Sequence, residues 1–270
     1  MSTANPTVWI TGASSGIGAA LARDWSARGA SLILSGRDRE RLQAVADDCG
    51  DCLILPFDVR DDAALADATA QAIAWKGSVD IAVANAGVSQ RSQALKTDMQ
   101  VYRDIIDIDL TAQIAFAQGL IGHMATRGSG NLLFISSIAG KVGVPMRTAY
   151  CAAKFGLAGY ADALRAELSQ TGVSVHVIYP GSIATDVSRN ALTAEGEKRG
   201  RSDKAIDEGI PPADAAKAMV DAVDNGEREI VIAQGMEAGM GEMRRTPDAL
   251  FDQVAEMVAK GYIEKMEADS

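Results

Sequence analysis

Short apolar segments alternate with longer segments of helical periodicity along most of the chain. The apolar segments are typical of buried parallel strands, and they lie at Thr7–Thr11, Ser31–Ser35, Cys52–Phe57, Asp80–Ala84, Asn131–Ser136, Ser174–Tyr179 and Glu229–Ala233. Helical spacing predicts helices near Ile17–Arg28, Arg39–Asp48, Ala63–Trp75, Thr97–Arg127, Ala149–Thr171 and Pro212–Asn225. The alternation predicts an α/β fold, with a doubly wound parallel sheet of about seven strands and helices on both faces.

Length, composition and charge narrow the class of protein. The 270 residues suit a single α/β domain over 1–270, with a further helical segment predicted at about 247–268. A net charge of −10 argues against nucleic acid or an anionic membrane as a partner. The chain begins with no basic-then-apolar signal, and no apolar run approaches the roughly 18 residues of a membrane span. We therefore expect a cytoplasmic protein with no membrane span.

One cysteine pair, Cys49 and Cys52, has the C-x-x-C spacing of some metal and redox sites. No second Cys or His pair completes a zinc site, and the context of a redox motif is missing. We therefore expect no metal.

A glycine-rich turn follows the first predicted strand and opens a helix. It reads Thr11-Gly12-Ala13-Ser14-Ser15-Gly16-Ile17-Gly18. Glycines allow the backbone to approach a pyrophosphate closely, and the free amides at a helix start favour its negative charge. The spacing, T-G-x-x-x-G-x-G, differs from the common G-x-G-x-x-G fingerprint. Its position at the carboxyl end of a strand nevertheless predicts dinucleotide binding.

The end of the second strand bears on which dinucleotide binds. Gly36 stands where a ribose-binding acid is expected, and Arg37 follows it. An arginine here pairs with a 2′-phosphate, whereas a carboxylate repels it, so the sequence favours NADP(H) over NAD(H). The alternative is that Arg37 is one of several solvated charges in the run RDRER and that Asp38 binds a ribose.

Three side chains with complementary chemistry follow the fifth strand. Ser137 ends that strand, and Tyr150 and Lys154 lie four apart on the next predicted helix, on the same face. A tyrosine with a pKa near its model value of about 10 is a poor base until a nearby positive charge stabilises the phenolate. We therefore expect Lys154 to make Tyr150 acidic, Tyr150 to exchange a proton with a carbonyl oxygen, and Ser137 to bind that oxygen.

Together these motifs resemble the short-chain dehydrogenase/reductase family from Pro6 to about Ala233. The matching segments are Thr11–Gly18, Asn85–Gly87 (N-A-G), Tyr150–Lys154 (Y-x-x-x-K) and Pro180-Gly181 with Thr185 following. The resemblance implies a Rossmann-type oxidoreductase that transfers hydride between NADP(H) and an alcohol or carbonyl substrate. It assigns the cofactor to Gly12, Ser14, Ser15, Gly16, Ile17, Gly18, Arg37, Asp58, Val59, Asn85, Ala86, Gly87, Tyr150, Lys154, Pro180, Gly181, Ile183 and Thr185. In the family, the residues at Asp58 and Val59 hold the adenine, and those from Pro180 to Thr185 hold the nicotinamide end.

The chain departs from the family pattern at Asp109, where the family usually has asparagine. By resemblance, this residue supports a water chain that passes protons from Lys154 to solvent, partly through its backbone carbonyl. An ionised carboxylate accepts hydrogen bonds but cannot donate them. We therefore expect Asp109 to keep the relay and to alter its pH dependence.

The resemblance also suggests a substrate lid at about 187–210, whose charge is compatible with mobility or with a merely solvated loop. It suggests a homodimer or homotetramer formed by Thr97–Arg127 and Ala149–Thr171. The C-terminal helical segment resembles hydroxysteroid-dehydrogenase-type and broad carbonyl-reductase branches, which points to a lipophilic small-molecule substrate. Two alternatives stay open: a 3-oxoacyl carrier-protein reductase, and a sensor that binds NADP(H) without turnover.

Overall fold

The structure is a computed structural model that describes residues 5–243 and 248–261. Its centre is a seven-stranded parallel sheet in the order β3-β2-β1-β4-β5-β6-β7. The strands are β1 (Thr7–Thr11), β2 (Ser31–Gly36), β3 (Cys52–Pro56), β4 (Ile81–Ala84), β5 (Gly130–Ile135), β6 (Val173–Pro180) and β7 (Glu229–Ile232). The predicted doubly wound sheet is therefore confirmed, with strand ends displaced by at most one residue.

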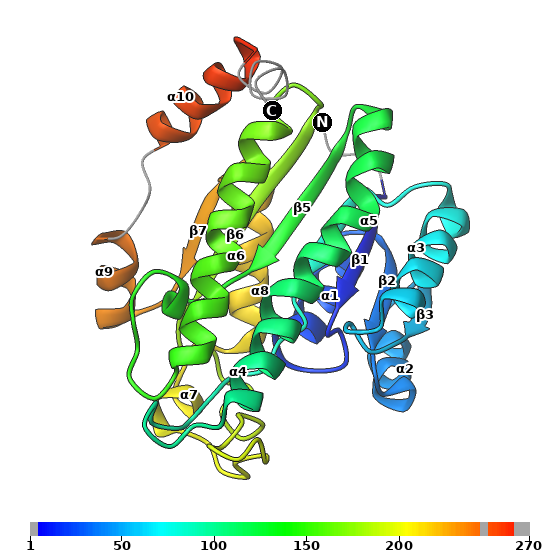
Figure 1. Cartoon of the computed structure of the whole chain (residues 1–270). Coiled ribbons are helices and arrows are strands. Elements are labelled where there is room, and N and C mark those ends of the chain that lie inside the picture. Colours follow the sequence, from blue (N-terminus) through cyan, green and yellow to red (C-terminus); the bar gives the residue numbers. More distant parts are fainter. Residues whose placement is uncertain (1–4, 244–247, 262–270) are drawn as a thin grey trace.

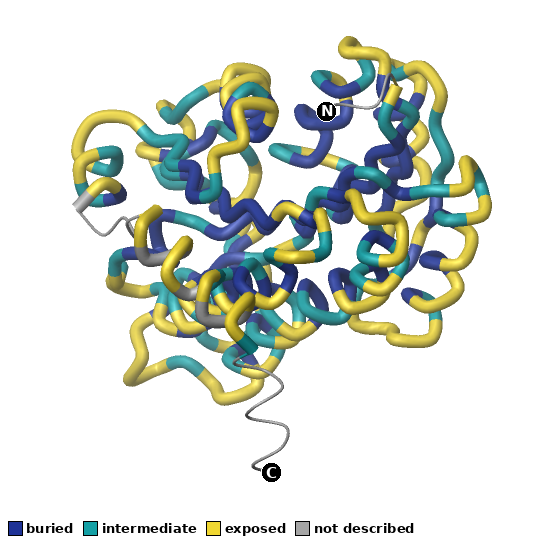
Figure 2. The backbone as a smooth tube through the Cα atoms, turned by 90° about the horizontal axis from the view of Figure 1, so that it is seen from above, coloured by how far each residue is buried: buried dark blue, intermediate teal, exposed yellow. Residues whose placement is uncertain are grey.

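Helices cover both faces of the sheet, as predicted (Figure 1). Those on one face are α1 (Gly16–Ala27), α2 (Arg39–Asp47) and α8 (Pro212–Asp224). Those on the other are α3 (Asp62–Lys76), α5 (Ala112–Arg127) and α6 (Thr148–Glu167). The strands between them are largely buried, as the central tube in Figure 2 shows. Apolar side chains on both sides of each strand form two cores, which explains why the strand sequences are almost continuously apolar.

The site is positioned by the point where strand order reverses. β1 pairs with β2 on one side and with β4 on the other. In such sheets, ligands bind outside the carboxyl ends of the strands at this point. The glycine turn follows β1 and the N-A-G segment follows β4, so the topology brings both to that edge.

The long helix predicted over Thr97–Arg127 is interrupted. It begins with α4 (Met99–Ile106), passes through a π-helical turn, η1 (Asp107–Thr111), and continues as α5. A π turn inserts an extra residue into the helical ladder and occurs often at functional sites. Here it contains Asp109, whose side chain is buried.

Three short elements were not predicted: a 3₁₀ turn, η2 (Ile138–Gly140), and helices α7 (Lys204–Asp207) and α9 (Gly235–Met243). Helix α6 also ends four residues before the predicted end at Thr171. The C-terminal helix α10 (Asp248–Ala259) lies within the predicted extension at 247–268, and it contacts α6. Residues 247 and 262–268 of that prediction lie outside the described residues.

Within the described ranges, Met99–Arg127 is the one helical segment whose length and hydropathy would suffice to cross a membrane. In this fold it contributes to the core beside the sheet and carries Asp109. Core helices of globular proteins meet the same criteria, so the segment is weak evidence for a membrane span.

Candidate active site

The glycine turn brings backbone groups closer together than side chains would allow. A Cβ on Gly18 would lie 2.4 Å from the carbonyl oxygen of Gly12, and one on Gly12 would lie 2.8 Å from Cα of Ala86. Gly12 and Gly16 also have positive φ values of 66° and 55°, which favour glycine. Helix α1 starts at Gly16, and no side chain caps its first amides. These features fit the predicted pyrophosphate site.

The N-A-G segment is tied directly to that turn. The side-chain amide of Asn85 donates to the carbonyl oxygen of Thr11 at 2.9 Å. The Thr11 hydroxyl accepts from the backbone amides of Asn85 and Ala86 at 3.0 and 3.1 Å. These bonds join the ends of β1 and β4, as the family resemblance implies for this segment.

A cavity of about 850 Å³ begins beside the turn. Ser14, Ser15, Gly16 and Thr185 line part of it. The rest is lined mainly by residues of α1, α2 and α8, among them Arg23, so only part of the cavity touches the predicted cofactor residues.

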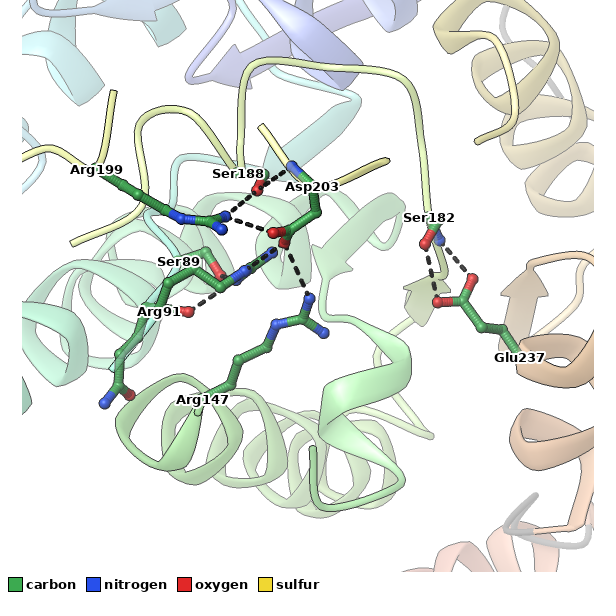
Figure 3. Close-up of polar contacts among 9 residues, drawn as sticks. Ser89, Arg91, Arg147, Ser182, Ser188, Arg199, Asp203 and Glu237 are labelled. Carbon is green, nitrogen blue, oxygen red and sulfur yellow. Dashed lines mark hydrogen bonds and ion pairs between the residues drawn. The ribbon is translucent and has the colours of Figure 1, made fainter. Parts of the chain in front are cut away.

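The P-G segment lies against the same turn. A Cβ on Gly16 would contact Cγ2 of Thr185 at 3.3 Å. Helix α9 holds this segment from the other side, because the Glu237 carboxylate accepts from the amide and the hydroxyl of Ser182 at 2.7 and 2.9 Å (Figure 3). Glu237 was not predicted as a site residue, since nothing local in its sequence marks it.

Ser137, Tyr150 and Lys154, the expected proton-handling residues, lie near one another at the ends of β5 and α6. Ser137 follows β5, and Tyr150 and Lys154 lie in the first two turns of α6. Ser137 is close enough to Tyr150 to lower the pKa of the phenol, and the Lys154 ammonium lies 5.6 Å from the centroid of the tyrosine ring. The start of a helix also favours negative charge, so α6 supports a phenolate at its third residue.

The protonation of Tyr150 differs from the sequence-based expectation. Lys154 does act to lower its pKa, together with Ser137 and Arg147. Burial and the charge of Asp109 act in the opposite direction and outweigh them, so the pKa of Tyr150 lies above its ordinary value. Lys154 therefore limits the rise in the pKa of Tyr150 but does not bring that pKa below its ordinary value.

Asp109 forms a buried ion pair with Lys154. One carboxylate oxygen lies 3.2 Å from the Lys154 ammonium, and the other accepts from the amide of Val88 at 2.8 Å. The ammonium also donates to the carbonyl oxygen of Ile135 at 3.0 Å. Burial opposes the charge on Lys154, but Asp109 and Tyr150 raise its pKa above the ordinary value. Burial also opposes the charge on Asp109: it raises the pKa of this carboxyl above the ordinary value, although Lys154 acts to lower it.

Gly87 leaves room for this pair. A Cβ at Gly87 would lie 3.0 Å from a carboxylate oxygen of Asp109 and 3.5 Å from the ammonium of Lys154. The third residue of the N-A-G segment therefore borders the proton-handling groups as well as the glycine turn.

The residues expected to determine the preference for NADP(H) or NAD(H) lie just after β2, at the predicted adenosine-binding end of the site. Arg37 is exposed after β2, and its charge acts on Asp58, which forms an ion pair with Arg60 at 2.8 Å. Hydrogen bonds from Arg60 lower the pKa of Asp58 to about 2. Asp38, the alternative ribose ligand, instead caps α2 by accepting from the amide of Arg41.

The predicted lid at 187–210 is folded around one carboxylate (Figure 3). Asp203 accepts from Arg91 at 2.6 Å and from Arg199 at 2.5 Å, and its amide donates to the Ser188 hydroxyl. Arg147 lies farther from it, at 3.7 Å. Burial opposes ionisation of Asp203, but the hydrogen bonds from Arg91, Arg199 and Ser188 hold its pKa well below the ordinary value.

Sequence reasoning did not identify Arg91 or Arg147 as site residues. Arg91 comes four residues after the N-A-G motif and Arg147 three residues before Tyr150. Proximity to motifs is the only signal that marks them.

The fold and these contacts define a nucleotide-binding α/β protein with its site at the reversal of strand order. Comparison with known families gives a match to the short chain dehydrogenase family over residues 6–196. The chain belongs to this family, whose members are oxidoreductases that bind a nicotinamide cofactor.

Several relatives are similar over most of the chain. Dehydrogenase/reductase SDR family member 7B of Danio rerio is 38% identical over 237 residues, which cover 84% of this chain and 76% of the relative. Dehydrogenase/reductase SDR family member 7 of Mus musculus is 34% identical over 84% of this chain and 70% of its own.

Solved structures agree in fold. A short-chain dehydrogenase from Streptomyces avermitilis has a TM-score of 0.77 at 27% identity and covers 97% of this chain and 99% of its own. A serine dehydrogenase complexed with NADP⁺ has a TM-score of 0.78 at 26% identity, over 84% and 94% of the two chains.

Proposed function

We propose that the protein interconverts an alcohol and its carbonyl with NADP(H), with Tyr150 as the group that donates and accepts the proton. The observation that carries this proposal is the convergence of Ser137, Tyr150 and Lys154 at the carboxyl edge of the sheet. A sensor that only binds the cofactor would not need this partly buried tyrosine beside a buried lysine.

The residues divide the work as follows. The bound nicotinamide supplies or accepts the hydride. Ser137 donates a hydrogen bond to the carbonyl oxygen and orients it toward Tyr150. In the reduction direction, the Tyr150 hydroxyl protonates that oxygen, and its raised pKa keeps it protonated at neutral pH. Lys154 then stabilises the phenolate that forms, while Asp109 and the carbonyl of Ile135 hold the ammonium in place.

The preference for NADP(H) is supported by the end of β2. Gly36 provides no carboxylate, Asp38 is engaged in capping α2, and Arg37 is exposed. An exposed guanidinium at this position is able to pair with a 2′-phosphate. The similar serine dehydrogenase was solved with NADP⁺, which is consistent with this preference.

The remaining features stay proposals of the same kind. Four large apolar side chains are exposed on segments that flank the site, namely Leu95, Met99, Met146 and Val187. They support a substrate with an apolar portion. We also propose a homodimer or homotetramer and a cytoplasmic location, which cell fractionation would test.

The deciding experiment is a panel of ketones, aldehydes and 3-oxoacyl thioesters assayed with NADPH and with NADH, using wild type and Tyr150→Phe. We expect turnover with NADPH, a lower kcat/KM with NADH, and loss of about 100-fold or more in Tyr150→Phe because the proton donor is gone. Binding of NADPH without oxidation by any substrate would favour the sensor. Full turnover by Tyr150→Phe would exclude the mechanism.

A further inference from the structure

The arginine cluster around Asp203 contains one more guanidinium group than the two that bond this carboxylate. Three guanidinium groups, from Arg91, Arg147 and Arg199, face the single carboxylate of Asp203. They come from three segments that border the active site: the stretch after N-A-G, the start of α6 and the predicted lid (Figure 3). Arg91 and Arg199 bond one oxygen each of the carboxylate, so the third guanidinium, that of Arg147, is not needed to hold Asp203.

Arg91 and Arg199 are the two that hold the lid. Arg91 donates to Asp203, to the Ser89 hydroxyl and to the carbonyl oxygen of Gln90, and its side chain is 7% exposed. Arg199 donates to the other oxygen of Asp203 and to the Ser188 hydroxyl. Both guanidinium groups are thus engaged in structural contacts.

Arg147 is placed differently. Its distance to Asp203 is 3.7 Å, too long for a hydrogen bond. Within the part of the chain that the structure describes, its side chain makes no hydrogen bond, although three quarters of it is shielded from solvent. Burial and the charge of Arg91 lower its pKa, whereas Asp203 raises it. The guanidinium is shielded from water, its N–H groups make no hydrogen bond among the described residues, and the nearest negative charge lies at 3.7 Å. Such a cation binds an anion favourably.

Arg147 lies next to the reacting groups along the chain. It is the N-cap of α6, with non-helical φ of −136° and ψ of 34°, three residues before Tyr150, and its guanidinium points toward Asp203 (Figure 3). The charges of Arg147 and Tyr150 interact, since Arg147 acts to lower the pKa of Tyr150. The preceding residue, Met146, has φ of 64°, which is unfavourable for a side chain of this kind. The amide of Ser92 donates to the Met146 carbonyl at 3.1 Å and helps to hold this conformation. Strained backbone of this kind persists where surrounding structure fixes it, often beside functional sites.

We propose that Arg147 forms an oxyanion subsite beside Tyr150 and that the substrate carries a carboxylate or phosphate group close to its reacting carbonyl. This inference rests on the proposed alcohol and carbonyl chemistry and specifies its substrate class. The anion pairs with the free N–H groups of Arg147, while the contacts of Arg91 and Arg199 with Asp203 keep the lid segment against the subsite. The apolar side chains at the rim leave room for an uncharged remainder of the substrate.

The test compares anionic substrates with an uncharged one. Wild type and Arg147→Gln are assayed with NADPH on three substrates of similar length: a linear keto acid, the methyl ester of that acid, and the phosphate monoester of a hydroxyketone. We expect wild type to prefer an anionic substrate over the ester. The substitution should lower the ratio of kcat/KM for anion to ester by about 10- to 100-fold, the range for a lost charge-assisted hydrogen bond. Any change in the pKa of Tyr150 affects all substrates alike and cancels in this ratio.

Arg189→Gln is the matched control, because Arg189 is an exposed lid arginine whose side chain pairs with Asp186. Its ratio should stay at the wild-type value. A preference for the keto acid or for the phosphate ester identifies which oxyanion the subsite takes. Equal kcat/KM for anion and ester in wild type, or a ratio unchanged in Arg147→Gln, overturns the proposal while the oxidoreductase function stands.

A binding measurement separates the two proposals if no substrate turns over. Calorimetric titration of the keto acid and of the phosphate ester into the protein with NADP⁺ should show binding of one of them that Arg147→Gln weakens by the same factor. That result would support the subsite although the proposed reaction had failed. Absence of binding of both anions to wild type would overturn the subsite.

Discussion

Asp109 places a second ionisable group beside Lys154 in a site shielded from solvent. Its carboxylate lies 3.2 Å from the ammonium, and its negative charge acts against the phenolate form of Tyr150. Asparagine, the usual residue in the family pattern, would leave the ammonium charge uncompensated. The acid therefore shifts the balance of the site toward a protonated tyrosine and a charged lysine.

We predict that Asp109→Asn moves the pH profile to lower pH. Reduction requires protonated Tyr150 and is lost as pH rises through its pKa, which Asp109 helps to raise. Removing the carboxylate lowers that pKa, so the alkaline limb of kcat/KM for reduction should shift down by about one pH unit or more. Oxidation requires the phenolate and should become active at lower pH. Measurement of both directions from acid to alkaline pH checks the sign.

Asp107→Asn provides the matched control, because Asp107 lies in the same π-helical turn but is exposed. The same change of charge there should leave the profile in place. An unshifted profile in Asp109→Asn would contradict the charge effect. The relay is a separate question: if Asp109→Ala preserved both rate and pH profile, Asp109 would have no part in proton transfer.

At the level of elements, the sequence predicted what depends on local periodicity. All seven strands were found because parallel strands buried on both faces give continuous apolar runs. The π-helical turn at 107–111 was not predicted, because inserting one residue barely changes the apolar pattern of a long helix. Helix α9 was not predicted because it contains Gly235, Gly239 and Gly241, and glycine has a low helix propensity.

In the site, too, local motifs were predicted and contacts between distant segments were not. The glycine turn and Tyr150 with Lys154 are short motifs, and the structure places them together. The ion pair of Arg91 with Asp203 joins residues 112 positions apart in sequence, and no local pattern encodes such a contact. The lid therefore resembled a solvated charge run in sequence, although Asp203 ties it to the rest of the site.

Helix α9 should support the predicted nicotinamide site through Glu237. Its carboxylate accepts both the amide and the hydroxyl of Ser182, next to Gly181. Glu237→Ala removes both bonds, each of a kind that contributes about 1.5–3 kcal/mol. The contacts act on the cofactor only through the P-G segment, so we expect a part of this free energy, about 1.4 kcal/mol or a tenfold rise in the Kd for NADPH, to be lost from binding. Ser182→Ala removes only the hydroxyl contact and should have a smaller effect. Fluorescence titration with NADPH measures both.

Glu195→Ala controls for the loss of one negative charge. Glu195 is a lid residue that accepts a hydrogen bond only from the nearby Thr193, so its loss should leave the Kd unchanged. The double variant of Glu237 and Ser182 should bind no more weakly than Glu237→Ala alone, because the contact is shared. Fully additive effects would contradict a direct coupling between α9 and the P-G segment.

At the scale of the whole molecule, the outer faces of α5 and α6 are less polar than an isolated surface usually is. On α6, the exposed residues Ala152, Phe155, Gly159 and Ala163 recur at helical spacing and form an uncharged stripe. On α5, which belongs to the segment apolar enough for a membrane, Gly122 is exposed with open space beside it, whereas Gly119 faces Thr69 of α3. Small residues allow helices to approach closely, so a second copy of the chain would cover these faces well.

We predict that the protein is a homodimer or homotetramer in buffer without detergent and that Phe155→Glu converts it to smaller species. Phe155 is 37% exposed on α6, and a carboxylate there would be buried against its symmetry copy without a partner, which costs several kcal/mol. Light scattering coupled to size exclusion measures the mass. Leu95→Glu is the control, since Leu95 is 98% exposed and belongs to neither helix, and its substitution should preserve the assembly. A monomeric wild type, or one that needs detergent to stay in solution, would assign the apolar faces to a different partner or to a membrane.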